Sequence, residues 1–316
     1  MAYAQYGNIA AADYNALVGG DPVTSSGALN TVWATGGTTA GYGQTAVGNV
    51  TVGTQVYAAN WANLVNKTAN CASHQGTSIT TVTAPASGGT ITYLSAIPTN
   101  LTTIYAPRLN AATQGSTVAN TATLGTTWSA AATFTHTVTF ANGNAARYFF
   151  NAGGQLKVTC SHPAGTGINL LMNNLASNIG TVVLSAPTSG TITISSVSFN
   201  GVTRIGGGGN APTTLPNNGY YALTTSNANI FTQTASTGPA GYLSTFIRVI
   251  AKSNGTQGVN GDAGSVITLY TVWDEVPDGL TVSTGSSTTV TVQAPETTYL
   301  ANTWGTITVA GTVTGA

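Results

Sequence analysis

Acidic residues gather near the end of the chain, where they could do chemistry. Five of the seven carboxylates fall between residues 262 and 296, and three of these stand together at Asp274, Glu275 and Asp278. Carboxylates at this density can bind calcium or act as the acid and base of glycoside hydrolysis. Neighbouring residues of a strand point to opposite faces, so Asp274 and Glu275 are not expected to converge. We expect a charged strand end that blocks edge pairing, with calcium binding and hydrolysis as alternatives.

The histidines and glycines offer little more chemistry. His74, His136 and His162 have no metal-ligand spacing to one another, to a cysteine or to a carboxylate. We place His136 on the threonine face of an alternating run and expect a surface or interface histidine. The run Gly206–Gly209 is similar to a phosphate-binding loop, but neither a Lys-Ser/Thr pair nor a helix pattern follows it. We interpret it as a flexible loop.

The sequence therefore predicts a protein without an active site. Its two cysteines, Cys71 and Cys160, lack a CxxC spacing. We expect two free buried thiols, with a disulfide between them as the alternative. No Gly-x-Ser-x-Gly nucleophile motif is present. We expect no catalytic residue, no cofactor and no metal ion.

Charge is scarce throughout the chain. Only 4% of the 316 residues are charged and the net charge is zero, whereas about 25% are charged in an ordinary soluble domain. Without a basic stripe we expect no nucleic-acid partner, and without an apolar run of about 18 residues we expect no membrane helix. The first residues do not have the pattern of a signal peptide. These features favour a subunit whose surface is largely covered by copies of itself or by partners.

The first 78 residues contain two short segments with helical spacing. Residues 9–18 and 56–65 align without a gap, and each carries an apolar residue, an aromatic residue five positions on and a leucine three further. The two stripes could form a small cap on the rest of the protein or dock on a neighbouring subunit. We interpret Gly19–Gln55 as a strap and residues 1–78 as an assembly anchor. The candidate interface residues are Ile9, Tyr14, Leu17, Val56, Trp61 and Leu64.

The remaining chain is predicted to be mainly β. Residues 79–131 are interpreted as a connecting arm, with a strand pair at Ser78–Thr83 and Thr90–Ser95 and a linker at Thr113–Ala131. From residue 132 onward, short alternating segments separated by turn residues predict strands. They lie at 133–140, 181–185, 191–199, 220–224, 229–234, 243–252, 265–274, 279–283, 288–293 and 306–310. Residues 147–150 and 155–160 are predicted to form a hairpin across a Gly-Gly turn, and Leu170–Asn178 is predicted to be a helix. Residues 132–316 are thus expected to form an antiparallel, jelly-roll-like β-sandwich.

One segment resembles a known signature. Tyr148-Phe-Phe-Asn-Ala-Gly-Gly-Gln-Leu156, preceded by Arg147, is similar to a Phe-Phe-Asn-x-Gly-Gly motif of virion structural proteins from tailed bacteriophages. The resemblance is strongest to marine and cyanobacterial phages with contractile tails. A strand, a small-residue loop, a short helix and a Gly-Thr pair follow in the same order, at 157–160, 165–167, 169–178 and 180–181. Weaker resemblances lie at 42–44, 58–65, 74–77, 220–221, 243–252 and 273–275.

The resemblance implies a non-catalytic structural component of a phage particle. We expect a tail, neck or appendage-base protein that is assembled in the host cytoplasm, with capsid decoration as the alternative location. Its expected partners are copies of itself, as a trimer or larger ring, and other virion proteins. A different class, a carbohydrate-binding adhesive module that recognises a host surface glycan, stays open because sandwich folds often present exposed aromatic side chains to sugars. Tyr220, Tyr221 and Trp304 are the candidates for such a site.

Overall fold

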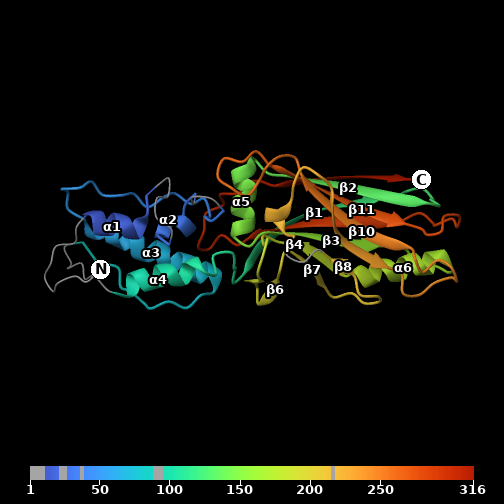
Figure 1. The fold of residues 1–316 in the computed structure, drawn as a ribbon, viewed down its shortest axis with the longest axis horizontal. Coiled ribbons are helices and arrows are strands. Elements are labelled where there is room, and N and C mark those ends of the chain that lie inside the picture. The colour runs from blue at the N-terminus through green and yellow to red at the C-terminus, as the bar shows by residue number, and fades with distance from the viewer. Residues whose placement is uncertain (1–10, 21–26, 36–38, 88–94, 215–217) are drawn as a thin grey trace.

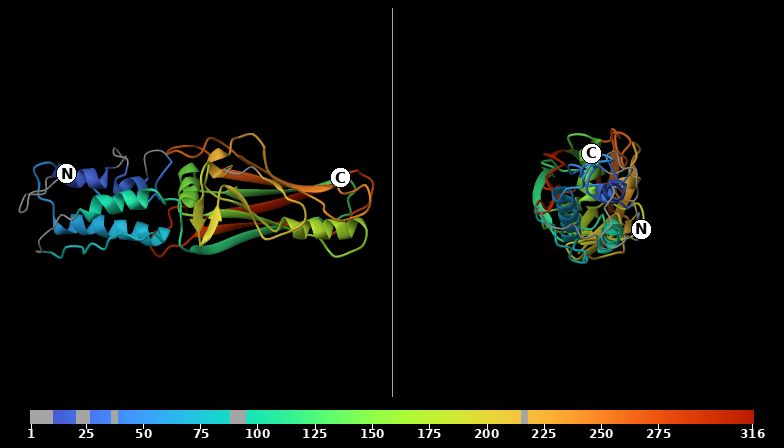
Figure 2. Two further views of the ribbon diagram at one scale, coloured as in Figure 1. Left: turned by 60° about the horizontal axis from the view of Figure 1, so that its bottom comes forward. Right: turned by 90° about the vertical axis from the view of Figure 1, so that its left-hand side faces the viewer.

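The computed structural model describes residues 11–20, 27–35, 39–87, 95–214 and 218–316. A helical part and a β-sandwich lie end to end along the long axis of the molecule (Figures 1 and 2). The mainly β, antiparallel architecture predicted from the sequence is confirmed. Among the described residues, no helix is long and apolar enough to cross a membrane.

The helical part is built around one long helix. α3 begins after Tyr57, whose backbone N–H donates to the side chain of Asn60 (3.0 Å), and it ends at Gly76, which adopts φ 69°. A left-handed C-terminal residue favours glycine, so the sequence fixes this end. The helix is longer than the predicted segment 56–65 because Thr68, Cys71 and other buried residues continue its inner stripe to Gln75. The helices of this part are α1 (Ala11–Val18), α2 (Leu29–Val32), α3 (Ala58–Gln75) and α4 (Ala96–Tyr105).

The connection between the first and third helices contributes to the core of the helical part. Trp33 and Tyr42 are both buried, and the Trp33 indole N–H donates to the Thr45 carbonyl (2.8 Å). The prediction of a strap with little core of its own is therefore wrong. α4 packs against α3 (Figure 2), so the helical part continues beyond the boundary predicted at residue 78.

Two antiparallel sheets form the sandwich. Strand β2 shows why they pack face to face: Ala132, Phe134 and Val138 are buried, whereas the threonines between them stay partly exposed. The five-stranded sheet contains, in spatial order, β1 (Gln114–Thr123), β12 (Ser287–Pro295), β3 (Gln155–Ser161), β4 (Thr181–Leu184) and β7 (Val202–Ile205). The six-stranded sheet contains β13 (Thr308–Gly315), β2 (Ala131–Thr139), β11 (Val266–Asp274), β10 (Phe246–Ser253), β9 (Ala228–Thr234) and β8 (Thr213–Thr214).

Strand β1 occupies most of the predicted linker. It pairs with β12 along its length, and the hydroxyl groups of Thr121 and Thr289 lie 2.7 Å apart across the pair. Its residues are mostly exposed because it forms an edge of its sheet. An edge strand without a strongly apolar face gives little alternation, so the sequence pattern resembles that of a linker. This part of the predicted connecting arm 79–131 therefore belongs to the sandwich.

The predicted hairpin at residues 147–160 is wrong in its first half. Residues 143–151 form helix α5 (Gly143–Asn151), and only β3 after it is a strand. Asn142 caps the helix by accepting a hydrogen bond from the backbone N–H of Ala145 (2.8 Å). At the other end of α5, Gly153 has φ 86° and ends the helix instead of forming a hairpin turn. The predicted helix 170–178 is confirmed as α6 (Ile168–Ile179).

Smaller differences concern short strands. The predicted strand 191–199 is a hairpin of β5 (Ile192–Ile194) and β6 (Val197–Phe199), with positive φ at Ser195 and Ser196. The predicted strand 220–224 is replaced by a short 3₁₀ helix, η1 (Tyr220–Ala222). In the predicted strand 279–283, Val282 forms one isolated bridge with Trp128. At the first site, Ser195 and Ser196 form the turn that divides the predicted strand in two.

Candidate functional site

Helix α5 forms the joint between the two parts of the molecule. It lies at the end of the sandwich that faces the helical part (Figures 1 and 2). Arg147 is fully buried, and its guanidinium donates to the backbone carbonyls of Thr35 (2.7 Å) and Ala40 (2.6 Å). Both carbonyls belong to the chain that follows α2. A buried guanidinium is stable only when its donors find acceptors, so these bonds hold the helical part against the sandwich.

Asn151 repeats this contact one turn further along α5. Its side-chain amide donates to the carbonyls of Thr39 and Gly41, both at 2.8 Å. The hydroxyl group of Tyr221 contacts the same Thr39 carbonyl (2.6 Å) and the Asn151 side-chain oxygen. Tyr221 follows the stacked rings of Phe150 and Tyr220, whose centroids lie 4.3 Å apart. Side chains of α5 and η1 therefore clamp residues 39–41.

Glycines allow the close packing at this joint. A Cβ atom on Gly43 would lie 2.3 Å from the ring of Tyr148, and one on Gly154 would lie 2.6 Å from the ring of Phe149. A Cβ atom on Gly153 would likewise lie 2.5 Å from the methyl group of Ala111. Real Cβ atoms do not tolerate such distances, so the two glycines of the motif are required by packing.

A second layer of the joint contains a buried titratable pair. His74 of α3 lies with its Nδ1 atom 3.6 Å from Oε1 of Glu296, which follows β12. Its Nε2 atom lies 3.1 Å from the carbonyl oxygen of Ala152. A carbonyl oxygen only accepts hydrogen bonds, so Nε2 carries the proton of the neutral ring. Nδ1 then has no proton, and it faces the Glu296 carboxylate with no hydrogen bond between them.

Burial and hydrogen bonding set the protonation of this pair. Burial lowers the pKa of His74 below its ordinary value, although the charge of Glu296 opposes this shift. Burial alone would raise the pKa of Glu296, but hydrogen bonds donated by Thr298 outweigh it and lower the pKa. Tyr42 packs edge-on against the imidazole, with centroids 5.2 Å apart. The pair therefore favours a neutral histidine beside an ionised carboxylate at neutral pH.

A second histidine belongs to a Ser-His-Asn arrangement that the sequence did not reveal. Nδ1 of His162 lies 2.9 Å from Oγ of Ser286, and its Nε2 lies 3.2 Å from Oδ1 of Asn169. This order of groups is shared with covalent catalysis. Ser286 is nevertheless fully buried, and its Oγ accepts a hydrogen bond from the indole N–H of Trp128 (3.2 Å). A substrate would not reach it in this fold, so the network satisfies buried polar groups.

The carboxylates at residues 274–278 do not converge, as strand alternation predicted, but they do not block a sheet edge because β11 lies between β2 and β10. Glu275 is buried, and its carboxylate accepts hydrogen bonds from the backbone N–H groups of Gly279 (3.3 Å) and Leu280 (3.0 Å). Asp278 is exposed, and Asp274 is half-buried at the end of β11. Among the described residues, no group of three or more histidine, cysteine or acidic side chains could hold a metal ion. Glu275 therefore organises the turn after β11.

The surface position predicted for His136 is wrong. In β2 it shares the inner face with Phe134 and Val138, and it is completely buried. The parity of the alternation places it there: His136 is two residues from each of them, whereas the threonines occupy the intervening positions. It lies beside Gly311 of β13, where a Cβ would be 2.8 Å from its Nε2 atom.

The other predictions about single residues have mixed outcomes. Both cysteines are free, with Cys71 buried and Cys160 half-buried. Gly207 packs against α6, where a Cβ would lie 2.2 Å from the carbonyl oxygen of Asn178, so this glycine run forms a tightly packed turn. Of the proposed sugar-binding aromatics, Tyr220 and Trp304 are buried, and the Tyr221 hydroxyl belongs to the joint.

The candidate interface residues lie inside the chain. Ile9 is outside the described residues. The other five have side chains in the core of the helical part. Of the two alternatives, the stripes therefore pack within the chain, and these side chains present no docking surface. They are Tyr14, Leu17, Val56, Trp61 and Leu64, with at most 7% of the residue surface exposed.

Comparisons with protein-family models, with curated proteins and with solved structures found no match. The contacts of Arg147 and Asn151 and the close packing of Gly153 and Gly154 all belong to one short segment of the chain. Together they make the motif at residues 147–154 a structural joint, without a nucleophile or metal ligand at its centre.

Proposed function

We propose that this protein is a structural subunit of a bacteriophage particle that acts through packing between subunits. The observation that carries the proposal is the joint at residues 147–154. The segment that resembles a virion-protein signature is the one that ties the helical part to the sandwich. A subunit that transmits force along a particle needs such a rigid connection between its parts. We place the subunit on the tail, neck or an appendage base, with capsid decoration as the alternative.

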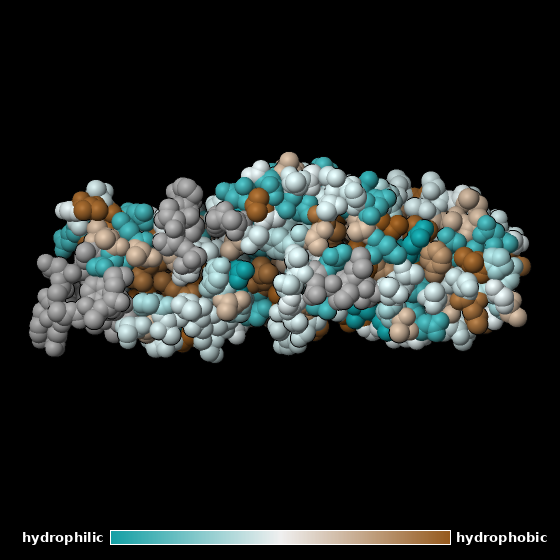
Figure 3. Space-filling view, in the orientation of Figure 1, coloured by the Kyte–Doolittle hydropathy of each residue, from teal (hydrophilic) through white to brown (hydrophobic). Residues whose placement is uncertain are grey.

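The composition of the surface supports the same proposal. The molecule exposes 13,095 Å² but has only seven basic and seven acidic residues, and Arg147, Glu275 and Glu296 are buried. On the face drawn in Figure 3, pale colours of intermediate hydropathy dominate and strongly hydrophilic residues are scattered. Free soluble proteins use more charge to resist association. Large permanent contacts with copies of the chain and with other virion proteins would cover this weakly polar surface.

Two measurements test the proposal. Size-exclusion chromatography with light scattering on the purified chain should give a trimer or a larger ring, and a clean monomer at micromolar concentration would count against self-assembly. Antibodies against the chain should label purified phage particles. Labelling at the tail or neck would support the main proposal, labelling over the head would favour decoration, and unlabelled particles would reject the virion role.

A further inference from the structure

A stretch of chain between α3 and α4 has the sequence of a strand, but in the described part of the chain no strand lies beside it. Residues 79–83 are Ile-Thr-Thr-Val-Thr, and β-branched residues of this kind favour extended backbone. The sequence predicted a strand pair here. Residues 90–94 of the predicted partner lie outside the described residues. Within the described part of the chain, no ladder hydrogen bond reaches residues 78–87.

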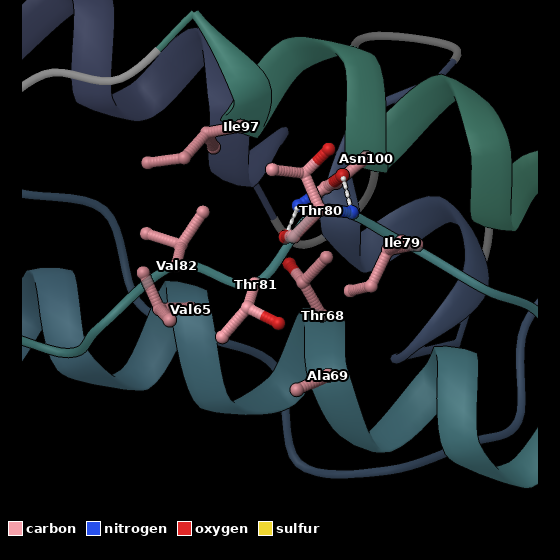
Figure 4. A pocket seen from close by; sticks show the side chains of 9 residues that line it. All are labelled: Val65, Thr68, Ala69, Ile79, Thr80, Thr81, Val82, Ile97 and Asn100. Carbon is pink, nitrogen blue, oxygen red and sulfur yellow. Dashed lines mark hydrogen bonds between the residues drawn. The ribbon is translucent and has the colours of Figure 1, made fainter.

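One edge of this stretch is already occupied by a side chain. Asn100 of α4 accepts a hydrogen bond from the backbone N–H of Thr80 (3.0 Å) and donates one to the carbonyl of Thr80 (2.8 Å), as the dashed lines in Figure 4 show. Asn100 is buried. It gives Thr80 the same pair of bonds that an adjacent strand would give. The stretch is therefore fixed on α4 through one edge.

Among the described residues, nothing pairs with the opposite edge. In extended backbone, the N–H and C=O groups of one residue point to one edge, and those of its neighbours point to the other. The groups of Ile79, Thr81 and Thr83 therefore face away from Asn100, and they have no hydrogen-bond partner among the described residues. The side chains of Thr81 and Thr83 are exposed. This edge can accept a strand without breaking any bond that the fold already makes.

A hollow lies beside the stretch. It has a volume of about 120 Å³ and is walled by the stretch itself, by α3 and by α4 (Figure 4). Val65 and Thr68 of α3 and Ile97 of α4 are buried at its walls, whereas Ala69 is exposed and adds only a methyl group. The hollow is mainly apolar and open to the surface. Its size suits one aliphatic side chain.

The surroundings define the charge of the occupant. Residues 76–107 contain no acidic or basic side chain. A charged segment would lose its hydration here without gaining an ion pair. We propose that the open edge at residues 79–83 binds an uncharged, extended polypeptide segment from a neighbouring subunit by strand addition, with one aliphatic side chain of that segment in the hollow. This inference rests on the backbone edge and does not depend on the virion role.

A peptide tests the proposal on the full-length chain. The probe is an acetylated and amidated peptide that copies residues 78–84, which form an uncharged strand of the required kind. Hydrogen exchange measured by mass spectrometry should show fast exchange at the open-edge amides of Ile79, Thr81 and Thr83 in the chain alone, whereas the Thr80 amide is held by Asn100. Saturating peptide should slow this exchange by at least about tenfold. The same peptide with T81K and T83K should give no protection.

Two proline variants of the chain separate the two edges. Thr81→Pro removes an N–H group from the open edge and should abolish binding of the peptide. Ser78→Pro removes an N–H group from the Asn100 edge and should leave binding unchanged. Slow exchange at Ile79, Thr81 and Thr83 in the chain alone would mean that the open edge is already occupied, and would overturn the proposal. Absence of protection at millimolar peptide, or equal binding by both variants, would overturn it as well.

Discussion

At the scale of single residues, the joint depends on donors that would be costly to bury without partners. Arg147 is the clearest case because its guanidinium is fully buried and donates to two backbone carbonyls of the helical part. Asn151 uses its amide group in the same way. Neither role requires the side chain to touch a ligand. The resemblance drew attention to this segment, but the partners at residues 35–41 are more than a hundred positions away and no local pattern predicts them.

Arg147→Met should destabilise the protein strongly. The substitution keeps a long apolar stem but removes the donors, so the carbonyl oxygens of Thr35 and Ala40 would be left buried without these partners. We expect a loss of about 3 kcal/mol in the free energy of unfolding, measured with urea. Arg248→Met, on the half-exposed face of β10, is the control and should change stability by less than about 0.5 kcal/mol. Equal losses for the two variants would contradict the role of Arg147.

Acidification should weaken the fold. Burial lowers the pKa of all three histidines, His74, His136 and His162. Below the ordinary histidine pKa of about 6.5, the unfolded chain therefore binds more protons than the folded chain. The free energy of unfolding should be highest above this pH and should fall as the pH decreases from 7 to 5. The lowered pKa of Glu296 adds a further loss below its ordinary value of 4.5.

Urea unfolding at pH 8, 7, 6 and 5 measures this dependence. His74→Gln retains a donor for the Ala152 carbonyl but does not titrate, so its stability should fall less steeply than that of the parent protein. A protein that gains stability on acidification would show that the histidines are charged in the folded state, contrary to this reasoning.

At the scale of elements, regular alternation made the sandwich predictable. Strands β2, β10, β11 and β12 have one buried residue in every two along most of their length, and each was predicted close to its observed bounds. β1 was missed because an edge strand needs no apolar face. α5 was mistaken for a strand because its aromatic run, Tyr148–Phe150, has the composition of one, whereas its cap and its glycine end are helical signals.

The cap of α5 gives a prediction at this scale. Asn142→Ala removes the side-chain acceptor for the Ala145 N–H group and should cost about 1 kcal/mol of stability. The control is Asn66→Ala on the exposed surface of α3, which should be neutral or slightly stabilising because alanine favours helices. Thermal unfolding followed by circular dichroism compares the two variants. A neutral Asn142→Ala would mean that tertiary contacts alone define where α5 begins.

At the scale of the whole molecule, the helical part is a packed core and not a free anchor. Trp61 is 1% exposed, and its ring lies 6.1 Å from that of Tyr14 between centroids. The amphipathic stripes were visible in the sequence. The spacing of the apolar residues is the same, however, whether a helix packs inside its own chain or on another subunit. Only the positions of Trp33, Tyr42 and α4 show which of the two is realised here.

Trp61→Ala should therefore act on folding before it acts on assembly. Removing a buried indole from this core should cost about 3–5 kcal/mol, seen as a large decrease in the Tm of the isolated subunit. Tyr57→Phe, at an exposed ring before α3, provides a control with unchanged Tm. If Trp61→Ala kept its Tm but failed to join particles, the side chain would have to be an interface residue in a different arrangement of the helices.

The end-to-end arrangement gives the molecule a direction that imaging can read. The last residue, Ala316, lies at the tip of the sandwich, whereas α1 lies at the far end of the helical part (Figure 1). A compact fluorescent or gold-binding tag fused after Ala316 would mark one pole of the subunit and leave the joint untouched. The radial position of the tag in averaged images of labelled particles would then reveal which pole points outward, and thus whether the tip of the sandwich or the helical part meets the surroundings.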